Sequence, residues 1–124
     1  MSARDLQFRD QQWVRSKSLD TFCPIGPAIV TTDAIPDPHK LGISSRVNGL
    51  LMQESDTSQM IFSIPALIAY CSKAFTLAPG DVIATGTPPG VGYFRTPPVV
   101  LADGDEVTID IEGIGVLRNT CRVS

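Results

Sequence analysis

The stretch GDVIATGTPPGVG, residues 80–92, decides how the rest of the chain can be arranged. Its apolar part, Val82 to Ala84, predicts a short strand, and the glycines and prolines that follow predict a tight loop. A strand that runs into such a loop delivers hydroxyls and free backbone N–H groups to one point, so the loop is a candidate anion-binding site. A purely structural turn is the simple alternative, but it leaves the two threonines unexplained.

A nucleotide-binding phosphate loop explains this stretch poorly. Such a loop carries a Lys followed by Ser or Thr after its second Gly, and it opens a helix. Here Gly92 is followed by YFRTPP, residues 93–98, whose prolines oppose a helix at that place. The sequence of this loop therefore does not predict nucleotide binding.

Length and composition predict a single small domain. The chain has 124 residues, with 10 Lys and Arg against 13 Asp and Glu and a net charge of −3, and this balance argues against a nucleic acid partner. The longest apolar run, residues 64–70, is too short to cross a bilayer, and the N-terminus has no apolar signal core. Three widely spaced cysteines, Cys23, Cys71 and Cys121, fit free thiols. We therefore expect a soluble, cytoplasmic protein without a membrane partner.

The pattern of apolar residues predicts a mainly β fold with one clear helix, which is an α+β class. The expected strands are residues 28–32, 82–84, 106–112 and 116–123, with a hairpin over residues 43–53. Asn48-Gly49 marks the turn of that hairpin because this dipeptide accepts positive φ at both positions. Ser63 is a candidate N-cap for the helix, whose apolar stripe should pack on the sheet.

Several polar residues have a plain structural explanation. Glu106, Asp110 and Glu112 share one face of a predicted strand, and the wet face of an antiparallel sheet explains them better than a metal site does. His39 lies in a proline-rich loop and is assigned no role. Lys17, taken alone, is an ordinary exposed lysine.

Three segments together resemble the fumarylacetoacetate hydrolase (FAH) family. They are residues 80–92, the block SARDLQ at residues 2–7, and the block SKSLDTFCPIGP at residues 16–27. The resemblance implies that residues 1–124 are the C-terminal portion of one FAH-like catalytic domain, a mixed β roll that is present here as a partial domain. It also implies a homodimer, because members of the family usually work as dimers.

The resemblance also implies the site residues. Lys17 matches the family's active-site lysine and is the candidate catalytic residue, since an ammonium can hold a carboxylate or stabilise an enolate oxygen. Arg4 and Gln7 match positions that point into the active site, and the Gly86-Thr87 amides are expected to bind a substrate carboxylate. These four residues are therefore the candidate substrate-binding residues.

The implied activity is metal-dependent hydrolysis of a C–C bond, decarboxylation or isomerisation of small acylpyruvate-like oxo acids, with Mg²⁺ or Mn²⁺ as a Lewis acid. The family's Glu-x-Glu ligand pair does not occur in this sequence, so no metal ligand is assigned. We expect that the chain is truncated upstream of its metal ligands and is inactive alone. The alternative is a non-catalytic or degenerate FAH-like module that pairs with another subunit.

Overall fold

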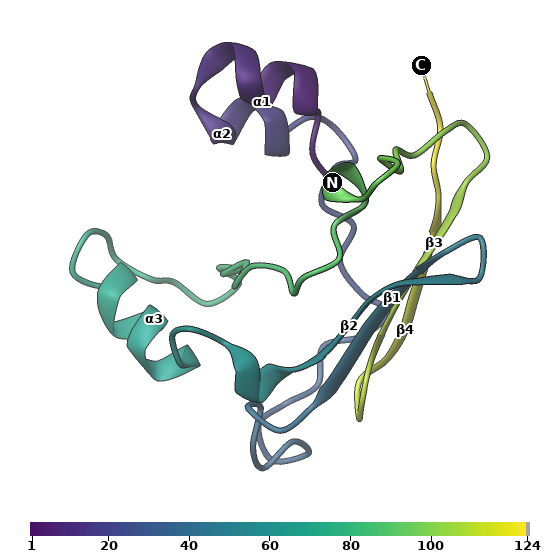
Figure 1. The fold of residues 1–124 in the computed structure, drawn as a ribbon. Coiled ribbons are helices and arrows are strands. Elements are labelled where there is room, and N and C mark those ends of the chain that lie inside the picture. The colour runs from purple at the N-terminus through teal and green to yellow at the C-terminus, as the bar shows by residue number, and fades with distance from the viewer. Residues whose placement is uncertain (124) are drawn as a thin grey trace.

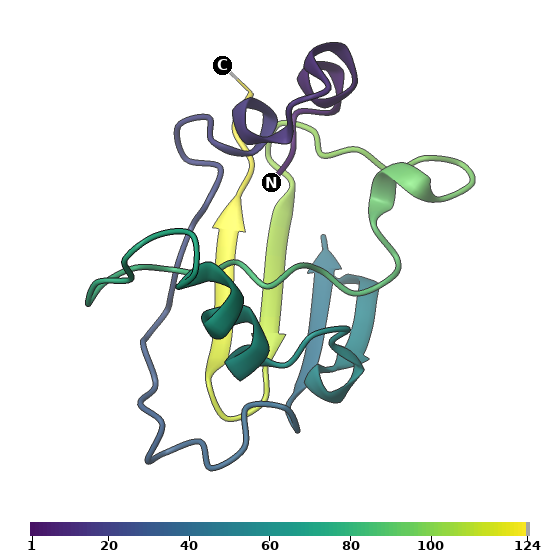
Figure 2. The same cartoon turned by 90° about the vertical axis from the view of Figure 1, so that its left-hand side faces the viewer.

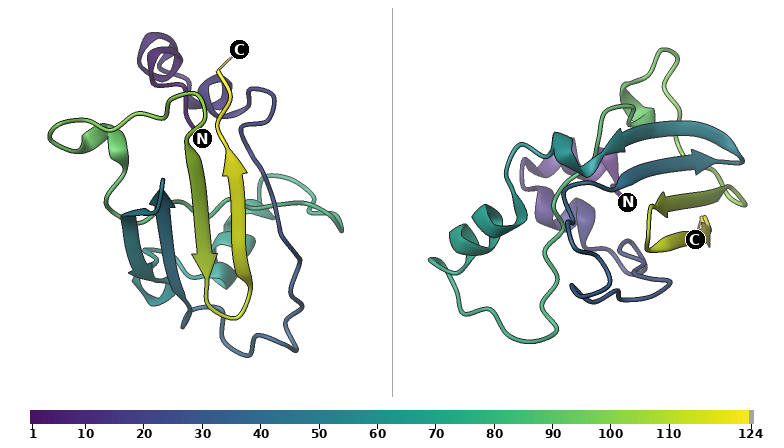
Figure 3. Two further views of the ribbon diagram at one scale, coloured as in Figure 1. Left: turned by 90° about the vertical axis from the view of Figure 1, so that its right-hand side faces the viewer. Right: turned by 90° about the horizontal axis from the view of Figure 1, so that it is seen from below.

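A four-stranded antiparallel sheet forms the frame of the chain (Figure 1). The computed structural model describes residues 1–123. Its strands are β1 (Gly42–Val47), β2 (Leu50–Asp56), β3 (Glu106–Ile111) and β4 (Gly115–Thr120), in the order β2-β1-β3-β4. The helices are α1 (Arg4–Asp10), α2 (Trp13–Lys17) and α3 (Ile64–Cys71), with short 3-10 turns η1 (Thr57–Gln59) and η2 (Gly92–Phe94). All three α-helices lie on one side of the sheet (Figure 3). The predicted α+β class is confirmed.

The predicted hairpin at Asn48-Gly49 is confirmed. These residues have φ of 50° and 80°, the left-handed conformation that a two-residue hairpin turn requires. The register of β1 on β2 shifts between Ser45 and Arg46, a β-bulge that strengthens the local twist. The turn therefore sets the pairing of the two strands.

The same asparagine connects this hairpin to the second one. The Asn48 side chain donates to a carboxylate oxygen of Asp105 at 2.8 Å and accepts from the Glu106 backbone N–H at 2.9 Å. Asp105 also accepts from the Ala102 N–H at 2.7 Å. These bonds lower the pKa of the Asp105 carboxyl below its ordinary value of 3.8, the Ala102 N–H being the largest cause and the Asn48 amide the next.

We expect this carboxylate to make the sheet acid-sensitive. Because the pKa of Asp105 is lower in the folded chain than in the unfolded chain, its contribution to stability is present above the ordinary value of 3.8 and is lost as pH falls through the folded pKa. Asp105→Asn should therefore flatten the fall in melting temperature between about pH 6 and pH 3. Thermal melts at several pH values check this, and equal slopes for both proteins would contradict it.

The predicted strand over residues 106–112 is confirmed as β3, which forms a second hairpin with β4. Residues Glu106 to Ile111 pair antiparallel with β4, and Gly113 has φ of 73° in the connecting turn. Glu106 forms an ion pair with Arg118 at 3.1 Å, and Glu112 accepts from the Gly42 N–H at 3.0 Å. These two carboxylates thus serve the sheet itself.

Two of the predicted strands are wrong. Residues 28–32 and 82–84 have no strand conformation in the structure. A β-branched sequence becomes a strand only when its backbone groups find a ladder, and neither segment joins the four-stranded sheet. Figure 2 shows the first of these segments passing outside β4, the edge strand.

Helix α3 begins where the sequence predicts. The Ser63 hydroxyl accepts from the Ala66 N–H at 3.4 Å, and Pro65 lies in the first turn. The predicted packing of its apolar stripe on the sheet is wrong, because α3 stands away from the strands (Figure 1). Ile68 is 44% exposed and Phe75, just beyond the helix, is 58% exposed.

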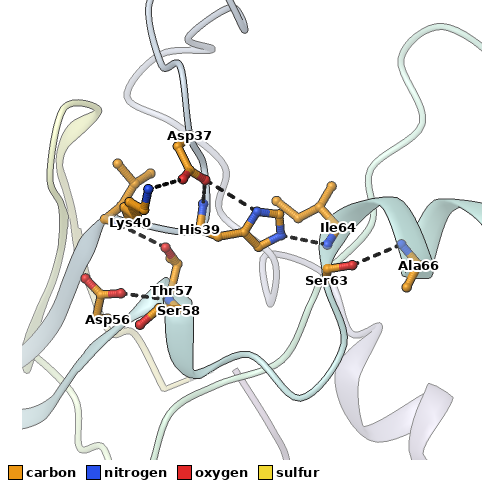
Figure 4. A network of polar contacts seen from close by, with 10 residues as sticks. Asp37, His39, Lys40, Asp56, Thr57, Ser58, Ser63, Ile64 and Ala66 are labelled. Carbon is orange, nitrogen blue, oxygen red and sulfur yellow. Dashed lines mark hydrogen bonds and ion pairs between the residues drawn. The ribbon is translucent and has the colours of Figure 1, made fainter.

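His39 holds the start of α3, a role that the sequence did not reveal. Its Nε2 accepts from the Ile64 N–H at 2.9 Å, and its Nδ1 lies 3.6 Å from a carboxylate oxygen of Asp37 (Figure 4). Asp37 also pairs with Lys40 at 3.0 Å. The imidazole therefore satisfies one of the free N–H groups at the helix N-terminus from a distant loop.

The chain buries very little apolar surface. Among residues 1–123, Met52 is the one hydrophobic residue that is buried. The accessible surface is 9328 Å², whereas a compact monomer of 13.3 kDa exposes about 6,500 Å². Large side chains such as Ile29, Ile61 and Tyr70 are more than three quarters exposed. Within residues 1–123 no helix has the length and apolarity needed to span a membrane.

We expect the isolated chain to associate or to lack a cooperative fold. Exposed apolar side chains and the open edges of β2 and β4 offer surfaces for self-association. Size-exclusion chromatography with light scattering and a calorimetric melt check this. A monodisperse monomer with a sharp melting transition would contradict the expectation.

Candidate functional site

Two short helices at the N-terminus carry three of the predicted site residues. The Ala3 N–H donates to the Ser16 carbonyl at 3.0 Å, which joins the start of α1 to α2. Gln7 of α1 and Ser16 of α2 are buried between them. The Arg4 guanidinium donates to the Gln7 amide oxygen at 2.8 Å. Arg4 and Gln7, both predicted from the block SARDLQ, thus form one bonded pair.

Lys17 lies at the end of α2, and its ammonium is exposed to solvent. It donates to the Ser2 hydroxyl at 2.6 Å and lies 5.9 Å from the centre of the Trp13 ring. Burial lowers the pKa of the Met1 ammonium, and the nearby positive charge of Lys17 lowers it further. The helix pair carries the basic residues Arg4, Arg9, Arg15 and Lys17 against the acidic residues Asp5 and Asp10, so its net charge is positive, as a site for an anionic substrate should be.

Aromatic residues connect this helix pair to the segment that follows the central loop. The Arg4 guanidinium lies 5.4 Å from the ring centre of Tyr93 and 5.2 Å from that of Phe94, both in η2. The Phe8 ring on α1 lies 5.7 Å from the Tyr93 ring. These contacts place the start of the chain against residues 92–94, which come directly after the glycine- and proline-rich stretch.

The central loop itself is attached to strand β2. Gly86 has φ of 112°, a conformation that only glycine adopts without strain. The Gln53 side chain on β2 donates to the Thr87 hydroxyl at 2.8 Å and to the Pro88 carbonyl at 2.6 Å. Thr87 is exposed, so its hydroxyl is open to a ligand.

The loop is held against β2 at a second place. The Arg95 guanidinium donates to the carbonyls of Met52 and Gly90. A Cβ atom at Gly90 would overlap the Met52 carbonyl oxygen, so the two backbones lie in direct contact. Residues 86–90 therefore pack on the strand through both backbone and side-chain contacts.

The predicted site residues thus form two groups. Arg4, Gln7 and Lys17 lie on the helix pair, whereas Gly86 and Thr87 lie on the loop that packs against β2. In Figure 1 the loop trace runs from the end of α3 toward η2 and passes below α1 and α2. The structure connects the groups through Arg4 and η2.

Sequence reasoning missed several partners of these residues. The sequence places Gln53 only within the predicted hairpin of residues 43–53, and its contact with the central loop becomes visible only in the structure. Ser2 lies in the block SARDLQ, but no role is predicted for it. No role is predicted for Tyr93 and Phe94, whose rings the structure places near Arg4.

The described residues do not fit a metal ion by themselves. Within residues 1–123 the structure brings no three His, Cys, Asp or Glu side chains together in a way that could hold one. A hard dication needs several oxygen ligands at once.

The open antiparallel sheet, the helix pair and the threonine loop held on β2 agree with the C-terminal part of an FAH-type fold. Residues 1–122 match the family described as "Fumarylacetoacetate (FAA) hydrolase C-terminal". The chain belongs to the fumarylacetoacetate hydrolase family.

Its relatives include enzymes with oxo-acid names. The chain is 58% identical over 120 residues to the oxaloacetate tautomerase Fahd2a of Rattus norvegicus, a mitochondrial protein, covering 96% of this chain and 38% of that protein. A solved fumarylacetoacetate hydrolase from Exiguobacterium antarcticum superposes with a TM-score of 0.95 at 49% identity, over 99% of this chain and 44% of that one. A 2-hydroxyhepta-2,4-diene-1,7-dioate isomerase from Mycobacterium marinum superposes with a TM-score of 0.85 at 50% identity, over 96% of this chain and 43% of that one.

The chain therefore spans less than half the length of these proteins. Its surface, larger than that of a compact monomer of its mass, agrees with a partial domain. The predicted domain range of residues 1–124 stays a prediction, and Ser124 lies outside the described residues.

Proposed function

We propose that this chain forms the substrate-binding part of an enzyme that acts on acylpyruvate-like oxo acids through an enolate. Keto–enol isomerisation of a 2-oxo dicarboxylic acid such as oxaloacetate is the first reaction to test, because the relative at 58% identity is named an oxaloacetate tautomerase. C–C bond hydrolysis and decarboxylation share the same enolate. The observation that carries the proposal is the electropositive helix pair, with Arg4, Gln7 and Lys17 gathered on it.

Lys17 is proposed to stabilise the enolate oxygen. Its ammonium is exposed, and the Ser2 hydroxyl and the Trp13 ring hold it at the end of α2. A fixed positive charge beside an oxygen that gains negative charge lowers the energy of the transition state. No acid or base role is needed for this effect.

Arg4 and Gln7 are proposed to orient the substrate. The bond from Arg4 occupies the Gln7 amide oxygen, so the Gln7 NH₂ remains available as a donor. The Arg4 guanidinium also lies within 5.4 Å of the Tyr93 ring centre and 5.2 Å of the Phe94 ring centre, and these contacts restrict its movement. On the other side, the Gly86 and Thr87 amides are proposed to bind a substrate carboxylate.

The complete protein is proposed to be a homodimer that needs Mg²⁺ or Mn²⁺. The ligands of that ion would lie outside residues 1–123, because this part of the chain gathers no suitable group. The chain alone is then expected to be inactive. The partial coverage of each relative supports this expectation.

A non-catalytic module that pairs with another subunit is the second candidate. The lack of a metal-holding group within residues 1–123 favours it, as do the many exposed apolar side chains. The hydrogen bonds that hold Arg4, Gln7, Lys17 and Thr87 in place favour the enzyme.

Calorimetric titration separates the two candidates. MgCl₂ and then oxalate, which mimics an enolate, are titrated into the chain and into a version extended upstream in the same reading frame. Loss of the enol absorbance of oxaloacetate reports turnover. Binding and turnover by the extended version alone support the enzyme, and their absence from both versions supports the non-catalytic module. Tight metal binding by the chain itself would contradict the proposal that the metal ligands lie outside residues 1–123.

A further inference from the structure

Gln53 controls which way the hydroxyl of Thr87 can point. Its amide nitrogen lies 2.6 Å from the Pro88 carbonyl, which can only accept a hydrogen bond, and its amide oxygen accepts from the Ser45 hydroxyl at 3.2 Å. These neighbours determine the orientation of the amide. The second hydrogen of the NH₂ group then donates to the Thr87 oxygen at 2.8 Å.

The bond from Gln53 determines whether the Thr87 hydroxyl donates or accepts toward a ligand. A hydroxyl has one hydrogen to donate, and an amide nitrogen cannot accept it. Because the Thr87 oxygen accepts from Gln53, its own hydrogen must point elsewhere. Thr87 is exposed, so that hydrogen is free to bind an acceptor from solvent.

The surrounding contacts make this arrangement rigid. Gly90 and the Met52 carbonyl touch, and Arg95 bonds to both. The loop is thus held on β2 at Met52 as well as at Gln53. A threonine on a mobile loop would lose conformational freedom on binding a ligand, whereas this one is already held in place.

We propose that Gln53 is a positioning residue that makes Thr87 a hydrogen-bond donor to a substrate carboxylate. The inference rests on the proposed function, since that function supplies the anionic ligand. Gln53 does not touch the substrate. It acts through the Thr87 hydroxyl and through the Pro88 carbonyl.

The test compares Gln53→Met, Gln53→Glu, Thr87→Val and the double variant Gln53→Met/Thr87→Val. They are made in the version extended upstream, with oxaloacetate as substrate. Methionine keeps the length of the side chain and removes the donor. Glutamate replaces the donor by acceptors, so the Thr87 hydrogen turns back toward β2. Gln59→Met, which changes an exposed glutamine bonded to Ser58, is the matched control.

Gln53→Met should raise KM about tenfold and change kcat less than twofold, as expected for the loss of a bond to a charged group. Gln53→Glu should raise KM further, and Gln59→Met should leave it unchanged. In the Thr87→Val background, Gln53→Met should have no further effect on KM. An unchanged KM, or equal effects in both backgrounds, would overturn the proposal.

Backbone NMR relaxation separates this inference from the proposed function. Gln53→Met should lower the order parameter of the Thr87 amide in the ligand-free protein, without any substrate. If the unmodified extended protein has no activity on oxaloacetate and does not bind oxalate, the proposed function fails and the donor role fails with it. An unchanged order parameter would show that Gln53 does not hold the loop, whatever the activity.

Discussion

Lys17→Met is expected to lower kcat for oxaloacetate isomerisation by about 10² to 10³, the usual effect of removing one group that stabilises a developing negative charge. The ammonium is the only part of the side chain that this change removes, since methionine has a similar length. Its partners, the Ser2 hydroxyl and the Trp13 ring, stay in place. KM should change much less than kcat, because the enolate charge develops only in the transition state.

The measurement is steady-state kinetics in the version extended upstream. Lys40→Met is the matched control, since Lys40 is 79% exposed and pairs with Asp37 in another part of the chain. Lys40→Met should change kcat less than twofold. Lys17→Arg should recover part of the activity, because it keeps the charge but not the compact ammonium. A fall in melting temperature that accounts for the loss, or full activity in Lys17→Met, would contradict the assigned role.

Gly90→Ala is expected to displace the central loop from β2. Gly90 has φ of 100°, and a Cβ atom there would overlap the Met52 carbonyl oxygen. The strain of the backbone alone costs about 1 to 3 kcal/mol, and the overlap with a backbone atom of the sheet adds to it. Because Gln53 is the next residue after Met52, its bond to Thr87 should break as the loop moves.

Gly104→Ala provides the control for strain without overlap. Gly104 has φ of 85°, but nothing lies within 4 Å of its missing Cβ. We expect Gly104→Ala to lower the melting temperature and leave oxalate affinity unchanged. Gly90→Ala should lower both, with oxalate affinity reduced at least tenfold. Equal effects of the two variants on oxalate binding would show that the contact with Met52 does not position the loop.

Local features of the fold followed from short stretches of sequence. The turn at Asn48-Gly49 and the cap at Ser63 depend on residues that lie within a few positions of one another. The alternation of residues 106–112 predicted β3 for the same reason. The segments 28–32 and 82–84 failed as strands because strand formation needs a partner from elsewhere in the fold.

Within the site, the family resemblance identified residues but not their partners. Arg4 and Gln7 are neighbours on one helix, so their contact follows from the helical spacing of three residues. The bond from Gln53 to Thr87 joins residues 34 positions apart, and the bond from His39 to the Ile64 N–H joins residues 25 apart. Neither separation is set by the period of a helix or a strand, so the sequence pattern does not predict these two contacts.

By itself, the sequence determined the family, the α+β class, both hairpins, the start of α3 and five candidate site residues. These depend on local backbone preferences or on contiguous blocks that resemble a known family. Only the tertiary structure decided that α3 stands off the sheet and that the loop is held by Gln53, Gly90 and Arg95. Contacts of this kind depend on which surfaces meet when distant segments fold together, and no single stretch of sequence contains that information.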